Sequence, residues 1–119
     1  MTKGQIEARI SEAISKFEVE YMGRGPEKIR TTIVQDMIII RLKGFLSVSE
    51  KHLALTRDGV ELIKKLRTAL FENAQAQFVE TIQSVINVNV ISVHSDVSTL
   101  TGEKIVVLIV DQDIDSSIN

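Results

Sequence analysis

The chain has 119 residues, of which 44% are hydrophobic and 25% charged, and this fits one globular domain rather than a disordered chain. The absence of cysteine excludes disulfides and thiolate metal sites and fits a reducing compartment, so we expect a cytoplasmic protein. The net charge of −2 and the aromatic content of 4% argue against a nucleic-acid-binding protein.

The first expected element is a helix that starts after Thr2 and ends near Met22. Thr2 and Gln5 form a capping box. The segment Gly23-Arg24-Gly25-Pro26 stops the helix, because glycine is preferred just past a helix end and proline cannot continue it. Apolar residues recur at helical spacing at Ile6, Ile10, Ala13, Ile14, Phe17 and Tyr21, and the opposite face carries Arg9, Glu12, Lys16, Glu18 and Glu20.

A hairpin follows, because Lys28–Val34 and Met37–Lys43 are rich in β-branched and aliphatic residues and are separated only by Gln35-Asp36. From Ser47 to Asn87 the pattern is helical, which is too long for one helix in so small a domain. We expect breaks at Thr56–Gly59 and at Asn73-Ala74.

The last third predicts a second hairpin. Asn87–Val93 alternates as a strand, Ser95–Glu103 forms a polar loop, and Lys104–Asp111 is the final strand. Its core, Ile105–Val110, is wholly apolar, which is typical of a central strand buried on both faces. The polar tail Asp111–Asn119 is expected to fray.

The element order predicts an α+β fold: a two-layer, mainly antiparallel four-stranded sheet of two hairpins, with helices packed on one face. We expect a single domain over residues 1–119. One helical layer covers only one face of the sheet, so the apolar last strand favours a homodimer through the sheet. Direct membrane insertion is not expected, because the longest apolar runs are far shorter than the ~20 residues of a membrane span.

The glycine-rich segment also suggests an anion site. Gly23 and Gly25 would let backbone N–H groups approach a phosphate or carboxylate, with Arg24 and Arg30 adding positive charge. The competing interpretation is a helix stop that leads into the first strand.

His94-Ser95-Asp96 contains the residue types of a catalytic triad, but neighbouring strand residues point to opposite faces and cannot form a relay. We therefore expect no catalytic residue here. His94 and Ser95 remain candidate ligand contacts, and Asp96 is expected to start a loop.

Two further groups of charged residues have ordinary explanations. Asp111, Asp113 and Asp115 resemble the start of a calcium loop but lack its glycine and closing glutamate, so neither a metal site nor a cofactor is expected. A short basic stretch is either a solvated helix face or a docking patch for an acidic partner; its members are Arg57, Lys64, Lys65 and Arg67.

The stretches GRGPEKIRTTIVQDMIIIRLKGFLSVSEK and VNVISVHSDVSTLTGEKIVVLIVD resemble a bacterial family, the MpsC-type domain of a Na⁺-translocating membrane-potential-generating system. The likeness extends from the first helix through Asp111. It implies a small cytoplasmic accessory subunit with a membrane-protein partner that carries the ion translocation. It implies no enzyme and supplies no catalytic residues.

Two functions therefore remain open. The first is a non-catalytic accessory or interaction subunit, which the absence of clustered catalytic groups favours. The alternative is a small-anion or metabolite sensor that uses Gly23, Arg24, Gly25, Arg30, His94 and Ser95.

Overall fold

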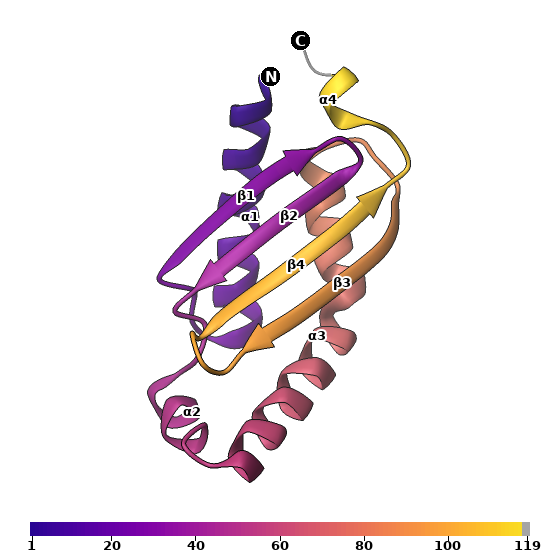
Figure 1. Cartoon of the computed structure of the whole chain (residues 1–119). Helices are drawn as coiled ribbons and strands as arrows, with labels where there is room; N and C mark the ends of the chain where they lie inside the picture. The colour runs from indigo at the N-terminus through magenta and orange to yellow at the C-terminus, as the bar shows by residue number, and fades with distance from the viewer. Residues whose placement is uncertain (118–119) are drawn as a thin grey trace.

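One antiparallel sheet with strand order β1-β2-β4-β3 forms the centre of the structure, a computed structural model that describes residues 1–117 (Figure 1). Its strands are β1 (Lys28–Val34), β2 (Met37–Lys43), β3 (Val90–Ser98) and β4 (Glu103–Val110). The hairpins β1-β2 and β3-β4 join through pairing of β2 with β4. The expected four-stranded antiparallel sheet of two hairpins is confirmed, and β4 is a central strand as the apolar run predicted.

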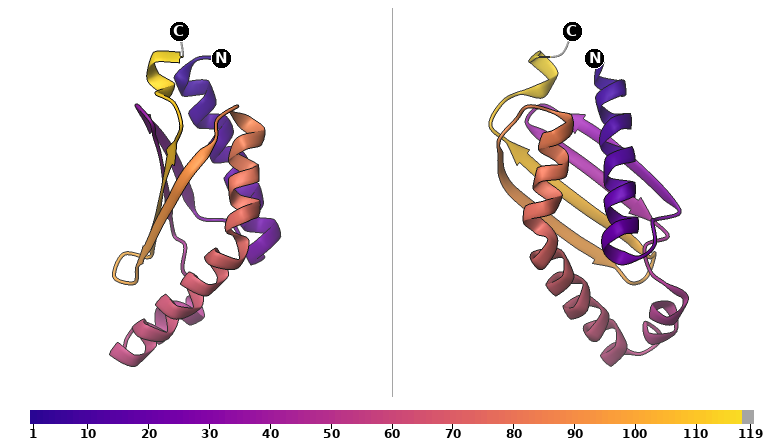
Figure 2. Two further views of the ribbon diagram at one scale, coloured as in Figure 1. Left: turned by 90° about the vertical axis from the view of Figure 1, so that its right-hand side faces the viewer. Right: turned by 180° about the vertical axis from the view of Figure 1, so that it is seen from behind.

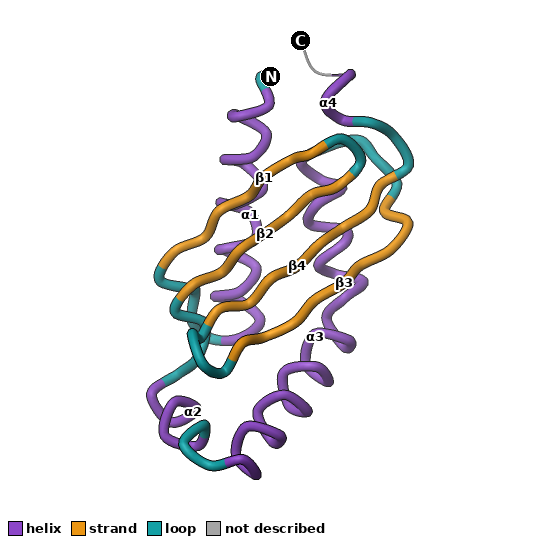
Figure 3. The backbone as a smooth tube through the Cα atoms, viewed as in Figure 1, coloured by secondary structure: helices purple, strands orange, loops and turns teal. Residues whose placement is uncertain are grey.

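Helices cover one face of this sheet. The long helices α1 (Lys3–Met22) and α3 (Arg57–Val85) lie side by side across it, and no helix formed by residues 1–117 covers the other face (Figure 2). The short helices α2 (Val48–Leu53) and α4 (Ile114–Ser117) lie beyond opposite ends of the sheet (Figure 1). Only short turns connect the strands within each hairpin (Figure 3). The fold class is therefore α+β, with two layers.

The core forms from apolar side chains that alternate along the strands and recur at helical spacing along α1 and α3. Every second strand residue points toward the helices, as Ile38, Ile40 and Leu42 do in β2. Phe78 of α3 is fully buried and packs edge-on against two other phenylalanine rings. The remaining core residues include Ile6, Ile10, Ile14, Ile33, Ile63, Ile82, Val106, Leu108 and Val110.

The ends of α1 follow the sequence prediction. The hydroxyl of Thr2 accepts a hydrogen bond from the Gln5 amide, and the Gln5 side chain accepts one from the Thr2 amide. Gly23 ends the helix with φ of 83°, a conformation that glycine adopts without a steric penalty. One residue is placed differently: Glu18, which was assigned to the opposite face, is buried.

The expected break at Asn73-Ala74 is wrong. Thr56 does cap a new helix, but that helix then runs unbroken from Arg57 to Val85. Ala74 is buried between Phe71 and Phe78 in one continuous apolar stripe, so packing outweighs the weak helix propensity of a single asparagine.

The boundaries of β3 also differ from the prediction. The strand begins at Val90 and continues to Ser98, so the first four residues of the expected polar loop belong to the strand. Its polar residues alternate with inward-facing ones, and Val97 is buried opposite Lys104. The polar residues of β3 therefore reflect a sheet face that is exposed to solvent, and they do not mark a loop.

The described part of the C-terminal tail is folded. α4 places Ile114 in the core, and the Asp115 carboxylate binds the Gln35 amide and the Lys3 ammonium. The expectation of a frayed tail is therefore wrong for residues 114–117, because Ile114 supplies an apolar anchor. Its last two positions, 118–119, lie outside the described residues.

Candidate functional site

Four charged side chains meet where α1, α2, α3 and β4 come together at the α2 end of the sheet. We call Glu18, Glu50, Arg67 and Lys104 the charged cluster. Glu18 lies four residues after Ile14 and so continues the buried stripe of α1. Lys104 lies two residues before Val106 and so points toward the helices. The positions of Glu18 in α1 and Lys104 in β4 therefore direct both charged side chains toward the interior.

Lys104 and Glu18 form a buried ion pair. Lys104 Nζ lies 3.9 Å from Glu18 Oε1, and the two side chains are only 7% and 3% exposed. The ammonium also lies 4.2 Å from the ring centroid of Phe71 and 4.8 Å from that of Phe45. These distances are typical of cation–π contacts, so the aromatic faces add to the stabilisation by the carboxylate.

Arg67 and Glu50 form a second, forked pair. Arg67 Nε donates to Glu50 Oε2 at 2.7 Å, and its Nη2 donates to Glu50 Oε1. The guanidinium also stacks 4.2 Å from the Phe45 ring centroid. Glu50 accepts a further hydrogen bond from the Ser47 amide at the start of α2. This pair therefore joins α2 to α3 with the directional geometry that arginine provides.

Burial shifts the ionisation of the cluster. Desolvation raises the pKa of Glu18, although Lys104 and Arg67 act in the opposite direction. Desolvation lowers the pKa of Lys104 to about 8, with Glu18 opposing the shift and Arg67 adding to it. Burial alone would raise the pKa of Glu50, but hydrogen bonds from Arg67 and Ser47 outweigh it, so the pKa is lowered.

Cavities of different size adjoin the charged cluster: one of about 330 Å³ is lined by Glu50 and Arg67, and one of about 70 Å³ by Arg67 and Lys104. The cavity beside Glu18 and Lys104 has a volume of about 10 Å³, room for about one water molecule. An amine with a pKa near 8 could act as a nucleophile or base where a substrate can reach it. The Lys104 side chain is only 7% exposed, and the cluster joins four elements of the fold.

The lowered pKa of Lys104 predicts a pH-dependent stability. In the unfolded chain this lysine titrates near 10.5, so between about pH 8 and 10.5 the unfolded state binds more protons than the folded state. We therefore expect the free energy of unfolding to rise with pH across this window, relative to a Lys104→Met variant. Urea unfolding of both proteins from pH 7 upward measures the difference. Parallel pH profiles would contradict the buried, charged state of Lys104.

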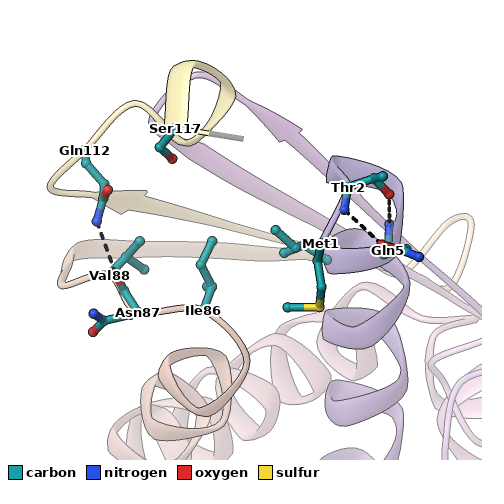
Figure 4. Close-up of a pocket in the computed structure, with 9 residues that line it drawn as sticks. Met1, Thr2, Gln5, Ile86, Asn87, Val88, Gln112 and Ser117 are labelled. Carbon is teal, nitrogen blue, oxygen red and sulfur yellow. Dashed lines mark hydrogen bonds between the residues drawn. The ribbon is translucent and has the colours of Figure 1, made fainter. Parts of the chain in front are cut away.

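At the other end of the helical layer, a pocket of about 610 Å³ lies between the start of α1 and the end of α3 (Figure 4). Thr2 and Gln5 at its edge are engaged in the capping box, and Gln112 donates to the carbonyl oxygen of Asn87. The lining side chains are uncharged. This pocket therefore offers apolar and hydrogen-bonding surface but no side-chain acid or base.

The glycine-rich segment lies near the charged cluster. Arg24 donates to the carbonyl oxygens of Gly44 and Phe45 and so ties the turn after α1 to the segment that follows β2. Arg24 and Gly25 line a pocket of about 330 Å³ that also contacts Arg67. The helix-stop interpretation of Gly23 is confirmed by its left-handed conformation, whereas anion binding here stays a prediction.

The remaining candidate residues lie elsewhere. Arg30 is exposed on edge strand β1. His94 is exposed on the opposite edge strand β3, where its Nε2 lies 3.1 Å from Ser92 Oγ. Ser95 points to the helical side, beside Lys104. Arg24 lies in the turn after α1, whereas His94 lies within β3, opposite Val107 of β4. The six candidates therefore occupy four separate places: the turn after α1, the edge strand β1, and the two opposite sides of β3.

The triad residue types are separated as the strand geometry predicted. His94 pairs opposite Val107 and Asp96 opposite Ile105, while the intervening Ser95 faces the other side of the sheet. Asp96 does not start a loop, since it lies within β3 and its carboxylate accepts from the Val97 amide. Ser98 starts the turn instead, where its hydroxyl accepts from the Thr101 amide.

Among residues 1–117 no group of three or more histidine, aspartate or glutamate side chains is arranged to hold a metal ion. Nor does any helix in the described part of the chain have the length and apolar character needed to cross a membrane.

Comparison with known proteins identifies the family. The family model described as Na⁺-translocating membrane potential-generating system (MpsC) matches residues 2–112. The uncharacterized protein YbcI of Bacillus subtilis (strain 168) is 34% identical over 117 residues, 98% of this chain and 94% of its own length. The uncharacterized protein YrhF of the same organism is 30% identical over 106 residues, 88% and 87% of the two chains. No solved structure matches. The chain therefore belongs to the MpsC family, as its sequence motifs indicated.

Proposed function

We propose that the chain is a non-catalytic, cytoplasmic accessory subunit of a Na⁺-translocating membrane-potential-generating system. It would act by binding a membrane-protein partner through a projecting tip of the molecule, defined here as residues 47–68. The description of the MpsC family supports the relation to this system. The observation that carries the proposal is the apolar surface of the tip.

The tip extends past the sheet. α2 and the first turns of α3 project beyond the ends of β2 and β3 (Figures 1 and 2), and Lys64, further along α3, reaches Asp96 of β3 at 3.5 Å. Large apolar side chains are exposed here, with Leu55 at 83%. The others are Val48, Leu53, Leu62 and Leu66. Exposed apolar side chains gathered on one projection are typical of a protein-binding surface.

The charge of the tip indicates the chemistry of its partner. Residues 48–67 contain five lysines and arginines against three aspartates and glutamates, whereas the whole chain carries a net charge of −2. Lys65 lies beside Leu62 and Leu66 in the sequence of α3, so positive and apolar groups are interspersed. A partner with an acidic and apolar surface would complement this arrangement.

Site-specific photocrosslinking in cells tests the proposal. A photoreactive amino acid at Leu55 is expected to give one discrete protein adduct in the membrane fraction, and Leu62→Ser/Leu66→Ser should abolish it. Leu100, which is 94% exposed in the β3-β4 turn, is the matched position for a control crosslinker. The same adduct from position 100 would contradict the proposal, as would crosslinking of position 55 to lipid alone.

A further inference from the structure

The sheet face that α1 and α3 leave uncovered, which we call the open face, has an apolar centre. On the two central strands, β2 and β4, five apolar side chains alternate with the core residues and are only partly covered. These side chains are Met37, Ile39, Ile105, Val107 and Ile109. A sheet with two apolar faces packs stably only when both are covered.

Charged residues of opposite sign lie on opposite halves of the open face. Arg30 of β1 pairs directly opposite Arg41 of β2, and Lys28 opposite Lys43. Like charges placed across two strands destabilise a sheet. The acidic residues of the face are Asp96 and Glu103 on the other hairpin, and Asp96, at the sheet edge, also lies 3.5 Å from the Lys64 ammonium of α3. Within the chain only the Arg41–Glu103 pair, at 2.8 Å, bridges the two halves among the described residues.

One symmetry operation brings these halves together. The strands carry the row Arg30, Arg41, Ile105, Asp96 in spatial order β1-β2-β4-β3. A twofold axis that lies in the interface, parallel to the strands and between β2 and β4, places β1 of one copy over β3 of the other. Arg30 then lies opposite Asp96 of the partner subunit, and Ile39 opposite Val107 of the partner subunit.

The geometry points to a homodimer in which two open faces pack against each other about this axis. A twofold interface must be complementary to itself, and this one places Arg30 opposite Asp96 of the partner subunit, while Arg41, which lies opposite Ile105 of the partner subunit, keeps its own pair with Glu103. A twofold axis perpendicular to the strands would instead place the row of Arg30 against the apolar row of Met37 and Ile109. Aligned strands within ~30° also match the usual packing of two sheets.

Charge reversal tests the inferred pair. Arg30 has a solvent-exposed side chain, and the Asp96 side chain is 84% exposed, so neither replacement disturbs the core. We expect the wild-type chain to sediment as a dimer at micromolar concentration. Arg30→Asp and Asp96→Lys, each alone, should weaken self-association by about tenfold or more, because each places like charges together twice in the dimer.

Mixing Arg30→Asp with Asp96→Lys is the decisive experiment for this pair. In a mixed dimer Asp at position 30 would meet Lys at position 96, and the unchanged Arg30 and Asp96 would meet as in the wild type, so association should return. Thermal unfolding of each variant controls for folding. A monomeric wild-type chain would overturn the inference and assign the open face to a different protein. So would variants that remain dimeric, or that fail to associate when mixed.

Discussion

Replacing Lys104 with methionine is expected to lower the free energy of unfolding by about 3–5 kcal/mol at pH 7, the usual effect of removing one member of a buried ion pair. The loss arises because Glu18 would remain buried without its principal counter-charge. Methionine fills a similar volume, so little of the effect comes from a cavity. Urea unfolding measures the change.

Removing both charges should restore most of this stability. In Glu18→Met/Lys104→Met neither desolvated charge remains, and Phe45 and Phe71 accept methionine as an apolar neighbour. The matched control is Lys3→Met, which breaks the exposed Lys3–Asp115 pair and should change stability by less than about 1 kcal/mol. A double variant as unstable as Lys104→Met alone would show that the ion pair is not the reason for the loss.

The sheet and α1 could be predicted because their signals are local. The capping box of Thr2 with Gln5 and the stop at Gly23 lie within the residues they define. Alternation in β2 likewise fixes which side chains face the helices. The errors arose where tertiary packing outweighed local preference: Ala74 is buried within α3, and Ile114 anchors α4.

The charged cluster could not be predicted in the same way, because its members come from four elements. Arg67 and Glu50 are 17 residues apart, and spacing alone does not show that α2 folds back on α3. Glu18 did carry a signal, since it continues the four-residue spacing of Ile10 and Ile14. The charge of a glutamate nevertheless predicts exposure, because unpaired glutamates are almost never fully buried. The partner that reverses this rule, Lys104, lies far away in the sequence.

Replacing Gly59 with alanine is expected to lower the free energy of unfolding by roughly 1–3 kcal/mol or more, the range for overpacking. A β-carbon at this position would lie 1.7 Å from the carbonyl oxygen of Leu53, where α2 ends against the first turn of α3. Backbone cannot rotate away as a side chain can, so the end of α2 must move. Glu50 would move with it, which weakens its pair with Arg67.

Gly4 provides the matched control for Gly59, because it also lies in the first turn of a helix but has open space around its α-carbon. Gly4→Ala should leave stability unchanged or raise it by up to about 1 kcal/mol, the ordinary effect of alanine in a helix. Urea unfolding gives both values, and amide hydrogen exchange in α2 should accelerate only in Gly59→Ala. Equal effects of the two substitutions would show that the close contact between α2 and α3 does not hold the tip in place.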